Sequence, residues 1–212
     1  MVVAPLVALI APQAMPAGVL LIGFAVTLLS TPRPLGAVAP SELIPAVIGR
    51  AAGAFAAAGV VALAPDPGSV AVLVALSVLV GVALSLSGLR LSITTPNLIG
   101  AGALSGLTGT LTSVGAPPLA LLYQHAPAAH ARATLNAFFS IGIALSLLAL
   151  AAQGQVRLSD AAFALSMVPA AACGFLLARP VMRRLGGRSV RPIILGLATL
   201  ASGMILLRWL VL

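Results

Sequence analysis

The run Ser69-Val-Ala-Val-Leu-Val-Ala-Leu-Ser-Val-Leu-Val-Gly-Val-Ala-Leu-Ser-Leu-Ser-Gly-Leu89 decides the class of this fold, because it carries no charged side chain. A helix that crosses the hydrocarbon core of a bilayer needs about 20 mostly apolar residues. The run also lacks the period-2 alternation of a half-buried strand, which favours a helix. We therefore expect residues 69–89 to form a transmembrane helix.

The rest of the chain has the same character. Of its 212 residues, 61% are hydrophobic and 7% are charged, whereas a soluble domain averages roughly 45–50% and about 25%. This composition excludes a disordered chain, a nucleic-acid-binding module and a soluble enzyme. The other apolar runs lie at about residues 2–30, 41–64, 97–124, 132–152, 159–180 and 190–212. The sequence predicts an all-α integral membrane protein, a polytopic bundle of about seven transmembrane helices.

The arginines predict how the chain is oriented. All 11 basic residues are arginines, and the densest cluster, Arg179–Arg191, surrounds one short loop. The positive-inside rule places this loop in the cytoplasm. Alternation then puts the loop near 153–158 outside and the loop near 125–131 inside. Three arginines fall on the outer side and make the bias incomplete: Arg33, Arg90 and Arg157. The lipid bilayer is therefore an expected partner of the chain.

Two parts of the chain resemble each other. Pro5-Leu6-Val7-Ala8-Leu9 matches Pro118-Leu119-Ala120-Leu121-Leu122, and Ser41-Glu42 matches Ser159-Asp160 in the same order and at a similar offset. Repeats of this kind are a recurrent transporter design, with the binding site between the halves. The sequence therefore predicts two parallel repeats, residues 1–92 and 93–212. The second has four helices, and the first has about three plus a stub and lacks the opening segment.

Small and polar residues gather between Gly102 and Pro118. Gly102, Gly106 and Gly109 fall on one helical face, which allows close helix packing in lipid. Five hydroxyl-bearing residues lie within the same segment: Ser105, Thr108, Thr110, Thr112 and Ser113. These hydroxyls either bond back to carbonyls of their own helix or present donors to a dehydrated oxyanion. The sequence leaves both interpretations open.

A helix break is expected near Gly115, because glycine permits the backbone geometry that a break requires. A following helix would then start near Ala116, Pro117 and Pro118. The N-terminus of a helix carries partial positive charge and unpaired amides, which suit an anion. This break is the preferred binding-site hypothesis, and a simple proline kink is the alternative.

The same segment carries a family resemblance. Residues 102–118 are followed by Pro127 and by Ala131-Arg132-Ala133-Thr134-Leu135. This pattern resembles the TauE/SafE sulfite-exporter-like family of membrane permeases, with a glycine-rich segment, a Gly-Gly-Pro-Pro-like turn and an Ala-Arg-Ala-Thr-like helix start. Ala116 stands at the second glycine of that turn. The resemblance implies a polytopic inner-membrane permease for small anions, often sulfur-containing ones such as sulfite or sulfonates.

Two residues after the turn are further candidates. As the family's arginine, Arg132 would help to gate or attract an anion, and otherwise it is an interfacial arginine that reaches the headgroups. Asn136 lies one turn deeper on the same face. It either points into the bundle or joins neighbouring helices.

Arg50 is the arginine farthest from a predicted interface. It lies about nine residues into the run 41–64, or roughly 13 Å deep at about 1.5 Å per residue. A charge at that depth is costly and usually faces the bundle interior or a wet cavity. Arg50 is therefore a candidate anion-binding cation, and the alternatives are pairing with a helix carbonyl or reaching the interface.

The titratable residues point away from catalysis and metal binding. Glu42 and Asp160 each follow a serine at a helix start, which fits helix capping, although either could carry a coupling proton. His125 and His130 are expected in a solvated loop, so no base faces a nucleophile within the membrane. The three acids form no metal-ligand cluster, and we expect no metal, no cofactor and no enzyme activity.

The sequence thus predicts a permease for a small anionic solute. We expect this solute to bind at Arg50, the hydroxyl segment and the turn. A non-transporting membrane subunit or scaffold is the alternative. A homo-oligomer stays open.

Overall fold

The computed structural model describes residues 7, 15–30, 38–64, 66–89, 91–113, 115–184 and 191–211. This described part is helical and contains no strand, as the sequence predicts. Its helices are α2 (Ala17–Ser30), α3 (Pro40–Leu63), α4 (Pro67–Leu86), α5 (Thr95–Thr112), α6 (Ala116–Tyr123), α7 (Ala128–Ala152), α8 (Leu158–Arg184) and α9 (Arg191–Val211).

Local signals explain where several helices begin. Proline occupies the first or second position of α3, α4, α5 and α6, where its missing N–H costs nothing and its fixed φ suits the helix. Asp66 also caps α4, because its side chain accepts a hydrogen bond from the Ser69 amide at 2.8 Å. Within the described residues, three helices are long and apolar enough to cross a membrane: Pro40–Leu63, Gly68–Leu86 and Ala129–Ala152.

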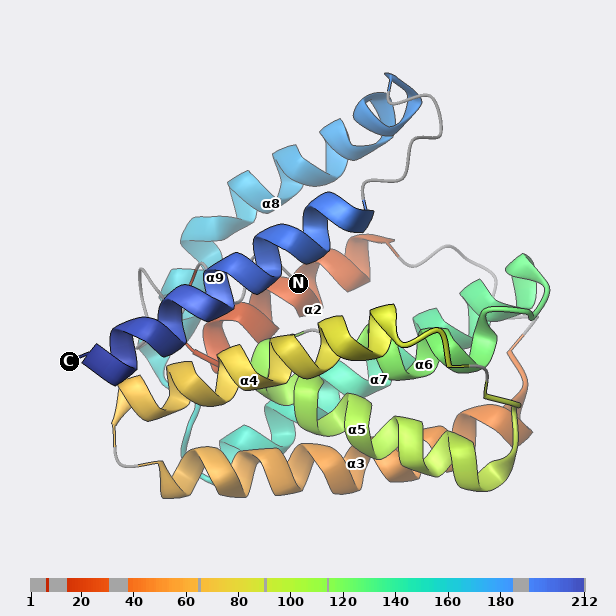
Figure 1. Ribbon diagram of the computed structural model, residues 1–212, viewed down its shortest axis with the longest axis horizontal. Helices are drawn as coiled ribbons and strands as arrows, with labels where there is room; N and C mark the ends of the chain where they lie inside the picture. Colours follow the sequence, from red (N-terminus) through yellow and green to blue (C-terminus); the bar gives the residue numbers. More distant parts are fainter. Residues whose placement is uncertain are drawn as a thin grey trace.

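The helices form a layered bundle (Figure 1). α3 packs against α5 and α7, α2 lies between α7 and α8, and α4 pairs with α9. Large apolar side chains remain exposed on the outer surface, such as Ile48 on α3 at 59%, Leu165 on α8 at 73% and Leu200 on α9 at 67%. An apolar exterior over a packed interior is the arrangement of a multi-pass membrane protein.

Glycines bring α3 and α5 into direct backbone contact. A Cβ at Gly49 or Gly53 would overlap the carbonyl oxygens of Ile99 and Ala103 on α5. A Cβ at Gly102 or Gly106 would overlap backbone of α3 in turn. The predicted small-residue face at 102, 106 and 109 is therefore confirmed as a packing face: Gly102 and Gly106 meet the backbone of α3, and Gly109 meets the Arg50 side chain.

The run 97–124 does not carry the chain from one end of the bundle to the other. α5 ends at Thr112, α6 begins at Ala116, and the side-chain amide of Gln124 after α6 donates a hydrogen bond to the Leu89 carbonyl before α5, at 3.0 Å. Both ends of the α5–α6 pair therefore meet at one end of the bundle, and the pair is a re-entrant hairpin (Figure 1).

This hairpin corrects the expectation that residues 97–124 form one crossing. The chain turns back after α5, because Ser113 ends that helix with a left-handed φ of 57° and α6 then runs toward the end where α5 began. The alternation that put the loop before α5 and the loop after α6 on opposite sides is therefore wrong. Arg33, Arg90 and residues 185–190 lie outside the described residues. The two repeats and their division at residue 92 stay a prediction.

Candidate functional site

Arg50 is buried at the centre of the bundle, with 2% of its surface exposed. Its Nη1 donates to the backbone carbonyl of Ser105 and, at 3.1 Å, to the Ser105 hydroxyl. Its Nη2 lies 3.3 Å from the Gly142 carbonyl oxygen and 3.1 Å from Ser146 Oγ, and its Nε lies 3.4 Å from the same Gly142 oxygen. The side chain thus joins α3 to α5 and α7.

Two further contacts order the oxygens around the guanidinium. The Ser105 hydroxyl donates to the Gly115 carbonyl at 2.6 Å, which ties the middle of α5 to the turn before α6. The hydroxyls of Thr110 and Ser146 lie 2.8 Å apart. A guanidinium carries five N–H donors, and the oxygens that accept from this one are all neutral.

Three glycines create the space for the guanidinium. A Cβ at Gly142 would lie 2.7 Å from Nε of Arg50, and one at Gly115 would lie 2.5 Å from Nη1. A Cβ at Gly109 would also overlap Nη1. The fourth side is aromatic, because the Arg50 Cζ lies 5.9 Å from the centre of the Phe138 ring, within cation–π range. The cavity for Arg50 is therefore built from small residues on three segments.

No described contact joins this charge to a carboxylate, and Glu42 pairs instead with His130 at 3.0 Å. Asp160 is buried, but it accepts a hydrogen bond from the Arg157 amide at 2.8 Å and caps α8 as expected. The site around Arg50 is therefore a buried positive charge surrounded by dipoles.

The predicted hydroxyl segment divides in two. Ser105 contacts Arg50, and Thr110 reaches it through Ser146. Thr108 and Thr112 instead donate to carbonyls of their own helix, at 2.9 and 2.8 Å. Ser113 ends α5, and its buried hydroxyl has no hydrogen-bond partner. Bonding back to the helix is thus confirmed for two of these residues, and contact with Arg50 is direct for Ser105 alone.

The predicted helix break near Gly115 is confirmed, but it offers an anion fewer backbone N–H donors than expected. Gly115 caps α6, which begins with Ala116, Pro117 and Pro118. Proline has no N–H, so two of the first three helical positions offer no amide to an anion. The turn therefore brings its backbone close to Arg50, but it does not present several free N–H groups to an anion.

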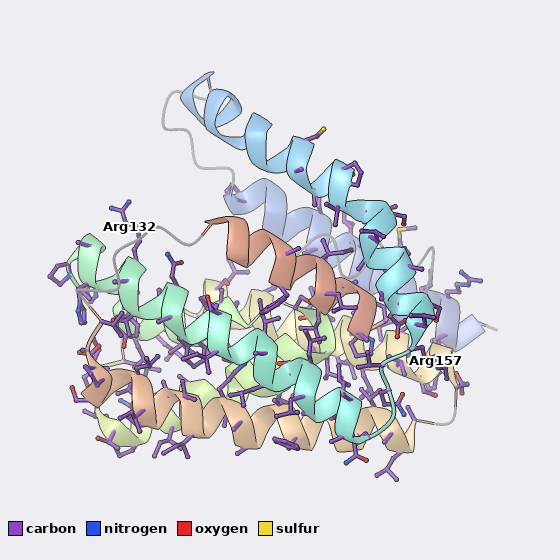
Figure 2. All side chains as sticks on the ribbon, turned by 180° about the vertical axis from the view of Figure 1, so that it is seen from behind. Arg132 and Arg157 are labelled. Atoms are coloured by element: carbon purple, nitrogen blue, oxygen red, sulfur yellow. The ribbon has the colours of Figure 1, made fainter. Side chains whose placement is uncertain are left out.

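The two later candidates lie away from Arg50. Arg132 is exposed and projects away from the bundle at one end, while Arg157 lies at the other (Figure 2). Asn136 is half-buried on α7, and its carbonyl accepts a hydrogen bond from Ser140 at 2.8 Å. Neither has a described contact with Arg50.

Sequence reasoning missed the α7 side of the site. Phe138, Gly142 and Ser146 are spaced four residues apart, so they share one helical face. That spacing was the available signal, but it does not say which helix the face packs against. It also missed that Glu42 bonds to Tyr123 and His130, since His130 was expected in a solvated loop.

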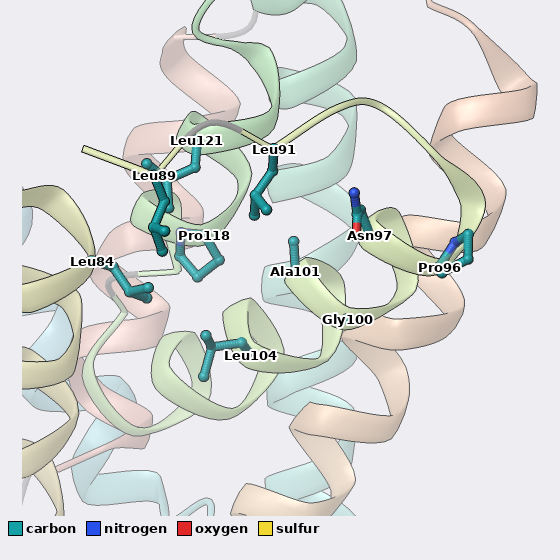
Figure 3. Close-up of a pocket in the computed structure, with 10 residues that line it drawn as sticks. All are labelled: Leu84, Leu89, Leu91, Pro96, Asn97, Gly100, Ala101, Leu104, Pro118 and Leu121. Carbon is teal, nitrogen blue, oxygen red and sulfur yellow. The ribbon is translucent and has the colours of Figure 1, made fainter. Parts of the chain in front are cut away.

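A cavity of about 230 Å³ lies apart from Arg50, between the end of α4 and the α5–α6 hairpin. Leu84, Leu89, Leu104 and Leu121 point into it, with Pro118 between them (Figure 3). Its walls are apolar, and Asn97 is committed to a hydrogen bond with the Ser92 carbonyl at 2.9 Å. This cavity does not suit an anion.

Comparison with known proteins identifies the family. Neither the curated proteins nor the solved structures contain a match. The family model described as "Sulfite exporter TauE/SafE" matches residues 1–205. The match covers nearly the whole chain, and it agrees with the motif at Gly102–Pro118 and with the apolar helices. The chain therefore belongs to the TauE/SafE sulfite exporter family, a family of membrane transporters rather than enzymes.

Proposed function

We propose that this chain is a permease that moves a small anion, sulfite or an organosulfonate, across the cytoplasmic membrane by alternating access and without covalent chemistry. The observation that carries the proposal is the buried guanidinium of Arg50, which has 2% exposure and only neutral oxygens as described partners. Family membership supports the transporter class, and the family's description as a sulfite exporter is the reason for proposing a sulfur-containing anion.

The energetics favour an anion at Arg50. Burying an unpaired charge costs several kcal/mol in a low-dielectric interior, and charged residues within membrane segments mark transport pathways. Carbonyl and hydroxyl dipoles offset part of that cost but leave the net charge in place. A small oxyanion would neutralise it and present its own oxygens to the N–H groups that now point at Ser105, Gly142 and Ser146.

The described conformation is the closed state of this proposed site. Every acceptor around the guanidinium comes from the protein, so an anion must displace some of them. The least constrained is the Gly115 turn, which the Ser105 hydrogen bond joins to α5, whereas α5 itself packs backbone to backbone against α3. Movement of α6 and the Gly115 turn would free the Ser105 hydroxyl and uncover Arg50.

The hairpin also brings the predicted topology into better agreement with the positive-inside rule. The loops that flank α5–α6 share one end, and the positive-inside rule makes that end cytoplasmic. Leu89 and Leu91, on either side of residue 90, then lie on the cytoplasmic side, whereas simple alternation of crossings placed this loop outside. Arg157 is left at the outer end (Figure 2).

Flux in proteoliposomes tests the proposal. We expect sulfite efflux by the purified protein, and a loss of at least about a hundredfold in Arg50→Gln, because a charge-assisted contact to the anion disappears. Arg157→Gln is the matched control, since it removes an exposed arginine at the outer end. Wild-type flux that equals empty vesicles for sulfite and for sulfonates contradicts the proposal.

A non-transporting subunit or scaffold is the second candidate. The observation that favours it is that Arg50, on α3, donates hydrogen bonds to both α5 and α7 and so holds the three helices together. A scaffold predicts that Arg50→Gln lowers the thermal midpoint of the protein while no anion changes that midpoint in the wild type. A permease predicts stabilisation of the wild type by its anion.

A further inference from the structure

A second polar cluster joins three helices at the end of the bundle where α5 begins and α6 ends. Glu42, in the first turn of α3, accepts a hydrogen bond from the Tyr123 hydroxyl at 2.8 Å. The same Oε2 atom lies 3.0 Å from Nε2 of His130. Tyr123 is the last residue of α6, and His130 lies in the first turn of α7. One carboxylate oxygen therefore holds α6 and α7 against α3.

The cluster is partly open to the aqueous end. The side chains of His130 and Glu42 are 29% and 22% exposed, so protons can reach both groups. A carboxylate and an imidazole are both groups that can take up a proton. The cluster is therefore a place where a proton can bind in a chain that has few titratable groups.

α6 links this cluster to Arg50. Its C-terminal residue is Tyr123, and its cap, Gly115, accepts the Ser105 hydrogen bond at 2.6 Å beside the guanidinium. The helix between them has 8 residues, or about 12 Å at about 1.5 Å per residue. A short helix held at both ends transmits a displacement at one end to the other.

α7 supplies a second connection along the same line. His130, Thr134 and Phe138 are spaced by four residues and lie on one face. Phe138 contacts the Arg50 guanidinium, and Thr134 has 2% exposure and a hydroxyl without a hydrogen-bond partner. An unpartnered buried hydroxyl is costly. Thr134 thus places a free polar group between the Glu42 cluster and Arg50.

Other charged groups near Glu42 are few. On α3 the next charge is Arg50, and α5 has no titratable side chain. The turn after α6 carries His125, which is exposed. On α7, Arg132 is exposed and projects away from the bundle (Figure 2). Tyr123 and His130 are therefore the described groups that contact the Glu42 carboxylate.

We propose that Glu42, Tyr123 and His130 form a proton-binding site that controls access of the anion to Arg50. This inference rests on the proposed function. The charged carboxylate accepts both hydrogen bonds, and charge-assisted hydrogen bonds are about twice as strong as neutral ones. A proton that binds the Glu42 carboxylate weakens both bonds and loosens α6 from α3. The Gly115 end of α6 then moves away from the guanidinium, and Arg50 becomes accessible.

Thiol labelling tests the release of α6 without any transport measurement. Leu121 on α6 is buried and points into the apolar cavity (Figure 3), so Leu121→Cys in a Cys173→Ser protein reports on movement of α6. The wild-type protein with its exposed native Cys173 gives the intrinsic pH dependence of thiol labelling. We expect the labelling rate of the thiol introduced at position 121, relative to that of Cys173, to rise roughly fivefold to tenfold from about pH 6 to about pH 4, where carboxylates take up protons, because hydrogen bonds to a charge then weaken.

Substitutions in this Leu121→Cys reporter protein assign the proton to Glu42. Glu42→Gln resembles the protonated carboxylate, so its relative labelling rate should be high and independent of pH. Tyr123→Phe removes one donor and should raise the rate at neutral pH. Asp66→Asn is the matched control, because it removes an exposed carboxylate that caps α4, and it should keep the response of the unsubstituted reporter. A reporter rate that does not change with pH, or a Glu42→Gln rate that follows the unsubstituted reporter, overturns the proposal.

Flux measurements then separate this inference from the proposed function. Sulfite flux in proteoliposomes should depend on pH in the wild type and lose that dependence in Glu42→Gln. If the wild type carries no anion, the proposed function fails, and labelling still decides whether protons release α6. If flux is present and its pH dependence is the same in Glu42→Gln, the permease stands and the proton site is wrong.

Discussion

The guanidinium of Arg50 lies directly on the backbone of Gly142, with Nη2 3.3 Å from the Gly142 carbonyl oxygen and no room for a Cβ between them. The contact joins residues from α3 and α7 that are 92 positions apart in the chain. It requires a long charged side chain on one helix and the absence of any side chain on the other. The charge and the glycine are therefore one structural unit.

Gly142→Ala should displace the guanidinium. Its Cβ would lie 2.7 Å from Nε and 3.2 Å from Cζ of Arg50, and overpacking of this kind costs about 1–3 kcal/mol. We expect a lower thermal midpoint in detergent and a loss of anion flux. Gly196→Ala is the control, because a Cβ there meets no atom within 4 Å. An unchanged midpoint in Gly142→Ala would contradict the described contact.

Gly53→Ala should separate α3 from α5. A Cβ at this position overlaps the Ala103 carbonyl oxygen, and backbone atoms cannot move aside as a flexible side chain can. We expect a destabilisation of about 3 kcal/mol, at the upper end of the range for overpacking, measured by unfolding in mixed detergent. Gly59→Ala on the same helix should be neutral or stabilising, because it meets nothing within 4 Å and alanine favours a helix. Equal effects at the two positions would rule out backbone contact.

The re-entrant hairpin predicts which loops share a side of the membrane. Single cysteines at Ser92 and His125 in a Cys173→Ser protein should react with an impermeant thiol reagent from the same side. Single cysteines at Asp66 and Gln153 should react from the other side, because α4 and α7 each cross the bundle. Opposite sides for Ser92 and His125 would mean that α5 and α6 together form a crossing.

Asp66 predicts a small pH dependence of stability. The amide and hydroxyl of Ser69 donate to its carboxylate, which lowers the pKa of Asp66 from the ordinary value of 3.8. The folded pKa is below the unfolded one, so the contribution to stability is present above about pH 4 and is lost as pH falls through the folded pKa. Asp66→Asn should remove that part of the acid response. The test compares the thermal midpoints of the two proteins from about pH 6 to about pH 3, where parallel curves would contradict the cap.

Part of the site followed from sequence. The helix break at Gly115 was predictable because glycine and two prolines interrupt an otherwise helical run. The glycine face of α5 was predictable because residues 102, 106 and 109 lie on one side of any helix. Arg50 stood out because a charge in an apolar run is costly wherever the run is placed.

Other parts did not follow from sequence. Nothing local in residues 138–146 identifies Gly142 and Ser146 as partners of an arginine 92 positions earlier. The Glu42 cluster escaped prediction for the same reason, since the first turns of α3 and α7 and the last turn of α6 meet only in the fold.

Composition alone settled that the chain is a helical membrane protein, because so few charges cannot cover a surface in contact with water. Local residue types settled where helices break and which helix faces carry only small residues, because those properties depend on neighbours within one or two turns. Only the tertiary structure decided that α5 and α6 turn back rather than cross, and that Arg50 reaches α7. Both outcomes depend on which helices pack together, and packing is set by contacts between residues that are distant in the chain.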